Sequence, residues 1–384
     1  MKRLLYLTYS DITTNEMLGV RKKILAQADA MRQLHPTLEV TVAFRSGSEL
    51  VLQDLSTGEE IRHSLRRGVT RYKASIVDCL KKTDASRQFD AVWLRCPFFV
   101  DPTVLQLARY FDEAKFYVEV PTYPIEGELK VVLRELRRDR NYVEWVVKCL
   151  NYVLHRACAP FLARRVTALV TYTASPIVFG KNAVRLCNGV DLRGAKVPAA
   201  RKATSRMEFV AVANLSTWNG YDRVIRGMAE MLGDADLSVS LTIVGDGSEL
   251  NNLKQLAESC GVADRVVFAG PQSGADLEAI CSGADAAIGS LALHRIGVHE
   301  ASPLKSREYC LAGLPFVYSY TDPDLDGNFP WALRIDSDDS PIDMRAVVGF
   351  VEKVQSDSEY ATKMYQYAAN NLAWNTQLAK VMKV

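Results

Sequence analysis

The chain lacks the long apolar segments of membrane proteins and the leader of secreted ones. No run of about 18 apolar residues, the length that a helix needs to cross a bilayer, occurs in its 384 residues. Residues 1–10 continue into a polar stretch and not into the small-residue cleavage site of a secretory signal. The sequence therefore predicts a cytoplasmic protein with neither a membrane span nor a secretory signal.

Metal-binding patterns are missing as well. The eight cysteines include no Cys-x-x-Cys pair, and none of them has a zinc-ligand spacing with the five histidines. Most of the cysteines lie in apolar stretches, which is typical of reduced, buried thiols. The sequence predicts no resident metal and no cofactor.

The net charge is small but unevenly distributed. The formal charge is +2, the pI is about 8.0 and no nucleic-acid-reading motif is present, so we do not expect a nucleic acid as partner. Residues 1–195 hold 30 Lys and Arg against 21 Asp and Glu, whereas residues 196–384 hold 17 against 24. Halves of opposite charge predict different binding partners for the two parts of the chain.

Apolar runs of strand length alternate with helical periodicity along the whole chain, which favours parallel sheets with helices on both faces. In the first half, the expected strands are residues 4–8, 39–44, 91–94, 116–120 and 168–172, and the first helix is 20–34. In the second half, strands are expected at 209–213, 241–244, 266–269, 286–289 and 316–318, and helices at 221–232, 249–260, 275–281 and 303–311. The length suffices for two cores. We predict an α/β protein with two Rossmann-like, doubly wound domains, residues 1–192 and 206–361, joined by a linker at 193–205.

The most informative segment is Glu-Ala-Ser-Pro-Leu-Lys-Ser-Arg-Glu at residues 300–308. Ser302 and Pro303 are a typical N-cap and first-turn pair, so we expect Glu300 in the loop before a helix and Glu308 on its second turn. First-turn N–H groups have no intrahelical acceptor, and they carry partial positive charge. The segment predicts an anion site flanked by two carboxylates, which suits the diphosphate and the sugar hydroxyls of a nucleotide sugar.

This segment resembles the Glu-x7-Glu signature of the retaining glycosyltransferases of family 4, which have the two-domain GT-B fold. Residues 188–191 (Asn-Gly-Val-Asp) resemble the family's interdomain element, residues 215–223 its first donor-domain loop and helix, and residues 242–247 its glycine loop. The motifs come in the family's order and cover residues 188–320, while the first half matches only in outline. The alternative interpretation is a Rossmann-like domain whose acidic pair is a solvated helix face.

The resemblance implies two domains that face each other across a cleft and a metal-independent transfer of a hexose from a nucleotide-diphosphate sugar. It assigns the hydroxyls of the transferred sugar to Glu300 and the ribose to Glu308. The implied donor-binding groups are the backbone of Ser302, Pro303, Leu304 and Lys305, the glycine loop at Gly245 and Gly247, and the base loop 269–272 with Gly270. A final helix at about residues 362–384 is expected to pack back on the first domain.

The donor loop departs from the family's pattern. Asn214 and Asn219 stand where the family commonly has an arginine and a lysine that neutralise the leaving diphosphate. Their loss removes electrostatic stabilisation, usually the largest catalytic contribution, unless another cation replaces them. We expect Lys305 to be that replacement, with Arg223 as the second candidate. The alternative is an inactive relative.

In the N-terminal half, the family places a glycine loop near the donor phosphates and the acceptor. Here it corresponds to residues 18–24, where Gly19 permits close backbone approach and Arg21 adds charge. Glu119 ends an expected strand at a place where many family members carry a histidine. Two interpretations remain: Glu119, Glu126 or Glu128 takes a polar or acceptor-activating role, or Glu119 is a structural carboxylate at the strand end.

Two charged segments also have competing interpretations. Residues 322–327 (Asp-Pro-Asp-Leu-Asp-Gly) resemble a calcium loop only superficially, and a solvated acidic loop is favoured. The loop histidines His294 and His299 are expected to be exposed. Residues 130–140 are strongly basic, and apolar residues follow as far as 154. This stretch either contacts an anionic membrane or forms a core helix whose outer face is solvated by arginines.

Together these features predict a glycosyltransferase at the inner face of the cell membrane. Its acceptor would be a glycan or a lipid-linked molecule in polysaccharide or glycoconjugate assembly. Two alternatives remain: a non-catalytic GT-B subunit that scaffolds an assembly complex, suggested by Asn214 and Asn219, and a nucleotide-sugar epimerase of similar architecture.

Overall fold

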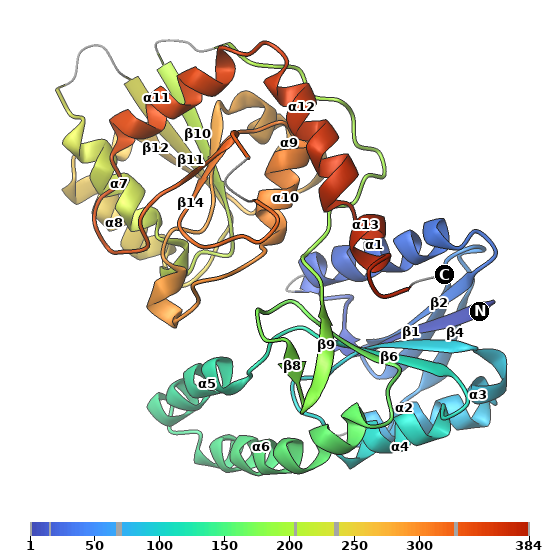
Figure 1. Cartoon of the computed structure of the whole chain (residues 1–384). Coiled ribbons are helices and arrows are strands. Elements are labelled where there is room, and N and C mark those ends of the chain that lie inside the picture. The colour runs from blue at the N-terminus through green and yellow to red at the C-terminus, as the bar shows by residue number, and fades with distance from the viewer. Residues whose placement is uncertain are drawn as a thin grey trace. The chain divides into compact units, whose positions relative to one another are not determined.

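The computed structural model describes residues 2–14, 17–66, 71–202, 206–233, 238–325 and 329–382. The chain forms two compact α/β units (Figure 1). Unit 1 comprises Met1–Leu186 and Trp374–Val384, and unit 2 comprises Cys187–Ala373. Each unit has its own mainly parallel sheet and its own core, which confirms the predicted fold class.

The sheet of unit 1 has strand order β4-β3-β2-β1-β5-β6-β7-β9-β8 in the described residues. Its strands are β1 (Arg3–Asp11), β2 (Glu39–Ser46), β3 (Glu49–Asp54), β4 (Glu60–Ser64), β5 (Ala91–Arg95), β6 (Lys115–Val120), β7 (Ala168–Thr171), β8 (Ile177–Val178) and β9 (Lys181–Arg185). All five strands expected in this half are present, and together with β9 they pair in parallel. Strand β9 and the antiparallel strands β3, β4 and β8, of which β4 and β8 are the edges of the sheet, were not predicted.

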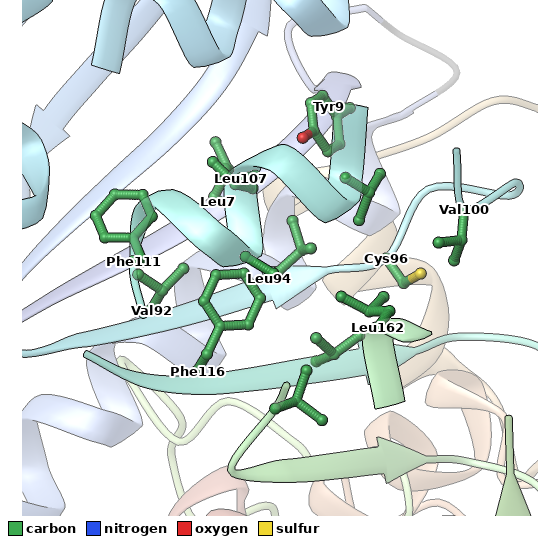
Figure 2. Close-up of a cluster of buried hydrophobic side chains, with 14 of the residues drawn as sticks. Leu7, Tyr9, Val92, Leu94, Cys96, Val100, Leu107, Phe111, Phe116 and Leu162 are labelled. Atoms are coloured by element: carbon green, nitrogen blue, oxygen red, sulfur yellow. The ribbon is translucent and has the colours of Figure 1, made fainter. Parts of the chain in front are cut away.

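The helices of unit 1 cover this sheet. They are α1 (Leu18–Leu34), α2 (Arg71–Lys82), α3 (Ala85–Gln88), α4 (Pro102–Tyr110), α5 (Glu126–Arg138), α6 (Tyr142–Ala163) and α13 (Trp374–Leu378). Figure 2 shows a core cluster in which Leu94 of β5 and Phe116 of β6 lie with Phe111 and with Leu162 of α6. Because the central strands are covered on both faces, their side chains are almost all apolar and buried.

The sheet of unit 2 has strand order β12-β11-β10-β13-β14-β15 in the described residues. Its strands are β10 (Arg206–Val212), β11 (Ser238–Val244), β12 (Val266–Gly270), β13 (Ala286–Ile288), β14 (Phe316–Tyr318) and β15 (Ala332–Arg334), and all pair in parallel. The helices are η2 (Thr217–Asn219), α7 (Tyr221–Glu230), α8 (Leu250–Ser259), η3 (Ala263–Arg265), α9 (Gly274–Gly283), η4 (Leu293–Ile296), α10 (Leu304–Leu311), α11 (Met344–Gln355), α12 (Tyr360–Tyr367) and η5 (Ala368–Leu372). Only β15 is an addition to the strands expected here.

The end of the chain differs from the expected single return helix at about 362–384. Tyr360, Met364 and Leu372 are buried in a core cluster of unit 2, so α12 and η5 belong to that unit. Only the segment from Trp374 onward belongs to unit 1, where α13 contacts α1. Unit 1 is thus completed by a chain section far away in sequence, whereas unit 2 is one continuous section.

Candidate functional site

The helix α10 and the segment before it form the centre of the candidate site in unit 2. The helix begins at Leu304 after the N-cap residue Pro303, and no side chain of the described residues caps its first turn. Ser302 is not the cap that the sequence predicted. Its hydroxyl accepts a hydrogen bond from the Asn188 N–H at 2.8 Å, and its carbonyl accepts one from Asn188 Nδ2 at 2.6 Å. The first-turn N–H groups of α10 therefore keep the character of an anion site.

Glu300 and Glu308 lie on either side of this helix start, as expected from the sequence. Glu300 forms an isolated parallel bridge with Thr321, where the Ala301 N–H donates to the Thr321 carbonyl at 3.0 Å and the Thr321 N–H to the His299 carbonyl at 2.8 Å. Glu308 lies on the second turn of α10. Both side chains are half-buried. The backbone pairing fixes the position of Glu300.

Lys305 is the cation of this site. It lies in the first turn of α10, half-buried, with its Nζ 6.0 Å from the ring centroid of Tyr221. No carboxylate of the described residues pairs with it, and burial lowers the pKa of its ammonium to about 8. A cation at a helix N-terminus is also disfavoured by the helix dipole. An ammonium held in this position without a counter-ion is suited to bind an anionic ligand.

Arg307, two residues further along, is neutralised within the protein. Its buried guanidinium donates to both carboxylate oxygens of Asp322, to Asp324 at 2.7 Å and to the Asn188 carbonyl at 3.1 Å. The expectation of a solvated acidic loop is therefore wrong for Asp322 and Asp324, because they are the counter-ions of this buried arginine. The pairing ties α10 to the segments before and after it.

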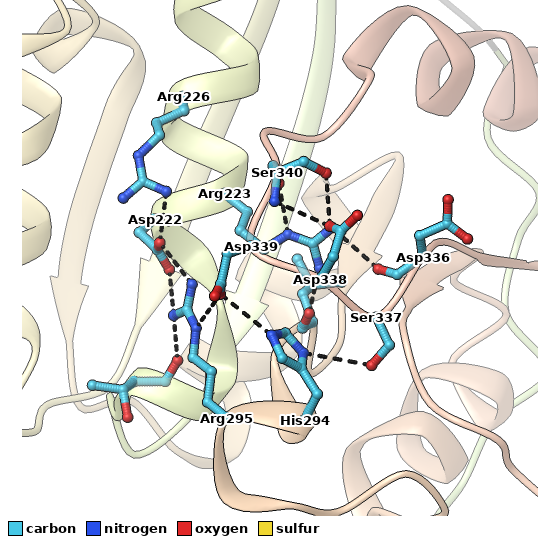
Figure 3. Close-up of polar contacts among 12 residues, drawn as sticks. Asp222, Arg223, Arg226, His294, Arg295, Asp336, Ser337, Asp338, Asp339 and Ser340 are labelled. Atoms are coloured by element: carbon cyan, nitrogen blue, oxygen red, sulfur yellow. Dashed lines mark hydrogen bonds and ion pairs between the residues drawn. The ribbon is translucent and has the colours of Figure 1, made fainter.

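The other predicted cation, Arg223, is committed to loop anchoring (Figure 3). Its guanidinium is buried and donates to the carbonyls of Ser340 at 2.7 Å, Leu291 at 2.5 Å and Asp336 at 3.1 Å, and to the Asp338 carboxylate at 2.9 Å. This differs from the expectation that Arg223 is available to a diphosphate. Lys305 thus remains as the candidate replacement cation.

Asn219 also has a local structural role. Its side-chain oxygen accepts the Ser216 N–H at 2.8 Å in a capping box of η2, and the residue is buried. Its backbone carbonyl accepts the Leu291 N–H at 2.9 Å, which joins the loops that follow β10 and β13. Asn219 therefore holds together the two loops at the carboxyl edge of the sheet through internal hydrogen bonds.

The neighbouring loop histidine His294 is part of a polar network and not simply exposed (Figure 3). Its Nε2 lies 3.3 Å from Asp339 Oδ1, and Arg295 donates to Asp339 at 2.7 Å and to Asp222 at 2.9 Å. This network joins η4 to α7 and to the 336–340 loop. His299, by contrast, is exposed as expected.

The glycine loop after β11 packs tightly against the loop after β10. A Cβ on Gly245 would lie 1.8 Å from the Ala213 carbonyl oxygen, and one on Gly247 would lie 2.3 Å from that of Leu215. The two glycines have φ values of 130° and 155°, which side chains rarely adopt. The Gly245 N–H also donates to the Gly270 carbonyl at 2.9 Å. The ends of β10, β11 and β12 thus meet at one edge of the sheet, where ligands of parallel α/β sheets bind.

A cavity of about 500 Å³ opens within unit 1 at the carboxyl ends of β1, β5 and β6. Tyr9, Arg45 and Arg95 are among its lining residues, together with Glu128 and His155. Tyr9 Oη and Arg45 Nε are buried and have no hydrogen-bond partner in the described residues. The cavity therefore offers unused hydrogen-bonding atoms to a ligand.

Of the N-terminal candidates from the sequence, Glu128 lines this cavity, whereas Gly19, Arg21 and Glu119 lie outside its lining. Gly19 and Arg21 are in the first turn of α1, where both are exposed. Glu119 is fully buried and accepts hydrogen bonds from Tyr6 at 3.2 Å, Trp93 at 3.1 Å and Arg95.

Lys23 completes the cluster around Glu119. Its Nζ lies 3.5 Å from Glu119 Oε1 and 3.6 Å from the ring centroid of Tyr172. Burial alone would raise the pKa of Glu119, but Lys23 and Arg95 outweigh it and the pKa is lowered. These contacts favour the structural interpretation of Glu119, whose partner Arg95 lines the cavity.

Comparison with known proteins identifies the class. Residues 195–326 match the family described as "Glycosyl transferases group 1". No curated protein sequence gives a significant match. Among solved structures, the chain resembles a glycosyltransferase from Rickettsia africae (TM-score 0.62, 11% identity), covering 98% of this chain and 96% of that one.

Two further structures have the same fold over nearly their whole length. HepE of Anabaena, solved in complex with UDP and glucose, gives a TM-score of 0.57 at 14% identity over 100% of this chain and 99% of that one. WaaG, a glycosyltransferase involved in lipopolysaccharide biosynthesis, gives 0.54 at 15% identity over 99% and 96%. The matched domain and the fold confirm the predicted class, a glycosyltransferase with the GT-B fold.

Proposed function

We propose that this glycosyltransferase uses a nucleotide-diphosphate sugar as donor and transfers a hexose with retention of configuration. The observation that carries the proposal is Lys305 at the start of α10, with Glu300 and Glu308 on either side. Its half-buried ammonium pairs with no carboxylate of the described residues. The bound UDP and glucose of HepE, a protein with the same fold, support a donor of this class. Retention and membership of family 4 rest on the resemblance of residues 300–308.

In this proposal, each group of the site has one task. Glu300 accepts hydrogen bonds from the hydroxyls of the transferred sugar, and Glu308 accepts them from the ribose. Lys305 and the backbone N–H groups of the helix start bind the diphosphate, while the loops at Gly245, Gly247 and Gly270 shape the nucleotide site. Since charge develops on the leaving diphosphate, a preorganised ammonium beside it lowers the barrier. Lys305 would thereby supply the charge that a metal ion supplies in other phosphate sites.

The acceptor side of the proposal belongs to unit 1. The cavity at the carboxyl ends of β1, β5 and β6 has unsatisfied Tyr9 and Arg45 atoms, which support binding of a polar acceptor. A glycan or lipid-linked molecule is the proposed acceptor class, and the cytoplasmic side of the cell membrane is the proposed location. None of the described helices combines the length and the apolar character that crossing a bilayer requires.

The scaffold alternative remains a second candidate because Asn219 and Arg223 are both used in internal contacts. A thermal-shift screen of nucleotide sugars tests the two against each other. A ligand at about 100 times its dissociation constant stabilises the protein by about 2.7 kcal/mol. We expect stabilisation by one class of nucleotide sugar and slow release of free sugar from it without acceptor. A scaffold would give neither result, and an epimerase would convert the nucleotide sugar into its epimer.

Glu308→Gln is expected to weaken nucleotide binding by roughly 10- to 100-fold, because a hydrogen bond to a charged group contributes about 1.5–3 kcal/mol. Calorimetry with UDP and GDP, and with the donor found in the screen, measures the loss. Glu352→Gln on the exposed face of α11 is the matched control and should leave the affinity unchanged. Equal affinity of Glu308→Gln and the control would exclude the proposed contact with the ribose.

A further inference from the structure

Exposed apolar side chains concentrate on one helical hairpin of unit 1, formed by α5 and α6. Of the 18 exposed large hydrophobic residues in the described chain, nine lie on this hairpin. They are Val131, Tyr142, Val143, Val146, Val147, Leu150, Val153, Leu154 and Phe161. Scattered exposed apolar residues are normal, but a contiguous group of this kind indicates an interaction surface.

On α6 these residues form a stripe along the helix. Val143, Val146, Leu150 and Val153 follow one another at steps of three or four residues, the spacing of one helix face. Val143 is 78% exposed, Leu150 60% and Val153 64%. The buried residues of α6, by contrast, are His155, Cys158, Ala159, Leu162 and Ala163. The exposed face of α6 therefore carries valines and leucines, which the interpretation of a core helix with a solvated arginine face does not explain.

The same hairpin also carries many exposed cations. The basic residues of the hairpin and its ends that are exposed are Lys130, Arg134, Arg137, Arg138, Arg140, Arg156, Arg164 and Arg165. Three of the acidic residues in the same stretch are already paired with bases of the hairpin: Glu126 with Arg156, Asp139 with Arg138, and Glu144 with Lys148. The charge that the hairpin offers to a partner is therefore positive.

We infer that the α5–α6 hairpin docks on an anionic lipid bilayer, with the apolar stripe of α6 lying in the interface and the flanking arginines contacting head groups. A helix with apolar residues on one face and Lys or Arg beside them binds membranes in this orientation. Its 22 residues give α6 a length of about 33 Å, long enough to lie along the surface. A second copy of the chain fits less well, because a symmetric pair would bring like charges together.

The hairpin also contributes residues to the lining of the unit-1 cavity. Glu128 of α5 and His155 of α6 line the cavity, so the element that touches the bilayer also forms a wall of the proposed acceptor site. A lipid-linked acceptor would then enter the cavity from the surface on which the enzyme lies. This last step rests on the proposed function, whereas the docking surface itself does not.

Flotation with vesicles tests the inference. Wild-type protein should float with vesicles of phosphatidylcholine mixed with phosphatidylserine at physiological salt, and less with phosphatidylcholine alone. Replacing Arg134, Arg137, Arg138 and Arg140 by Gln should lower the vesicle affinity on the order of 100-fold, and about 1 M salt should lower that of the wild type similarly. Replacing the exposed Val143, Leu150 and Val153 by Ser should cause a loss of similar order.

The matched control replaces Leu232, Val267 and Ile296, exposed apolar residues of unit 2, by Ser and should bind vesicles as the wild type does. Unchanged melting temperature and nucleotide affinity in all three variants would show that folding and the donor site are intact. If the wild type does not float, or if the hairpin variants float as well as it does, the inference is wrong. If the wild type binds no vesicles but forms a dimer, and if the hairpin serine variant is a monomer, the partner of the hairpin is a second copy of the chain. If the wild type floats with vesicles but binds no nucleotide sugar, the proposed function is wrong and the docking surface is not affected.

Discussion

Glu300→Gln is expected to lower turnover by on the order of 100- to 1,000-fold while leaving nucleotide affinity nearly unchanged. The amide keeps the shape of the side chain but loses the charge that accepts hydrogen bonds from the sugar hydroxyls. Removing one preorganised partner of the transition state typically costs this much. The fold should tolerate the change, because the Glu300 segment is held by the backbone bonds of Ala301 and Thr321.

Steady-state kinetics with the best donor, together with a thermal melt, measure this result. Glu300→Gln should lower kcat and kcat/KM together, which indicates an interaction made in the transition state. Glu308→Gln should instead act through binding, so the two variants separate the two carboxylates. Glu230→Gln, on an exposed position at the end of α7, is a control of the same chemistry. If Glu300→Gln retains wild-type turnover, Glu300 does not contact the transferred sugar.

The sequence predicted the central strands well because covered parallel strands have a simple pattern. Every central strand of the two sheets is a short run of buried apolar residues, such as β1 and β10, and such runs are visible without a structure. The antiparallel strands β3 and β4 are less apolar, and the edge strand β4 is almost entirely exposed. They form because β3 pairs with β2 and β4 pairs with β3, which composition does not reveal.

The candidate site was predicted only in part, since burial and partners decide what each charged residue does. Lys305 and Arg307 are two residues apart on α10, and in the sequence both appear as basic helix residues. Arg307 is neutralised by Asp322 and Asp324, 15 and 17 residues away, whereas Lys305 has no carboxylate partner in the described chain. Arg223 likewise looked available until its contacts with distant carbonyls were known. Such long-range pairing leaves no local signal.

The role of Glu119 in unit 1 could not be predicted from the local sequence either. Its position after an apolar strand fits both an active-site carboxylate and a structural one. The two roles are distinguished only by the partners of Glu119, which are Lys23 from α1 and Arg95 from β5. Burial of Lys23 lowers the pKa of its ammonium to about 7, although Glu119 opposes this shift. Near neutral pH the cluster thus holds the cation Arg95 and a partly charged Lys23 against one carboxylate.

Lys305→Ala is expected to weaken the binding of a nucleoside diphosphate by roughly 10- to 100-fold and that of the monophosphate far less. In the proposed complex the lost ammonium faces the distal phosphate, and a hydrogen bond to a charged partner contributes about 1.5–3 kcal/mol. Calorimetry with UDP and UMP, and with GDP and GMP, measures both losses. Lys353→Ala, on the exposed face of α11, is the matched control. Equal losses for both phosphates would mean that Lys305 does not contact the diphosphate.

The pH dependence of binding gives an independent readout for Lys305. The pKa of its ammonium in the free protein is about 8, and a bound diphosphate must raise it because the charged form is then stabilised. Binding therefore takes up a proton above pH 8, and the affinity should fall by up to about tenfold per pH unit until the pKa of the complex is reached. The phosphates add no slope there, since they titrate near pH 6. Lys305→Ala should show no such slope, and Lys305→Arg should restore binding with little dependence on pH, because arginine stays charged. A slope that survives in Lys305→Ala would assign the titrating cation to another residue.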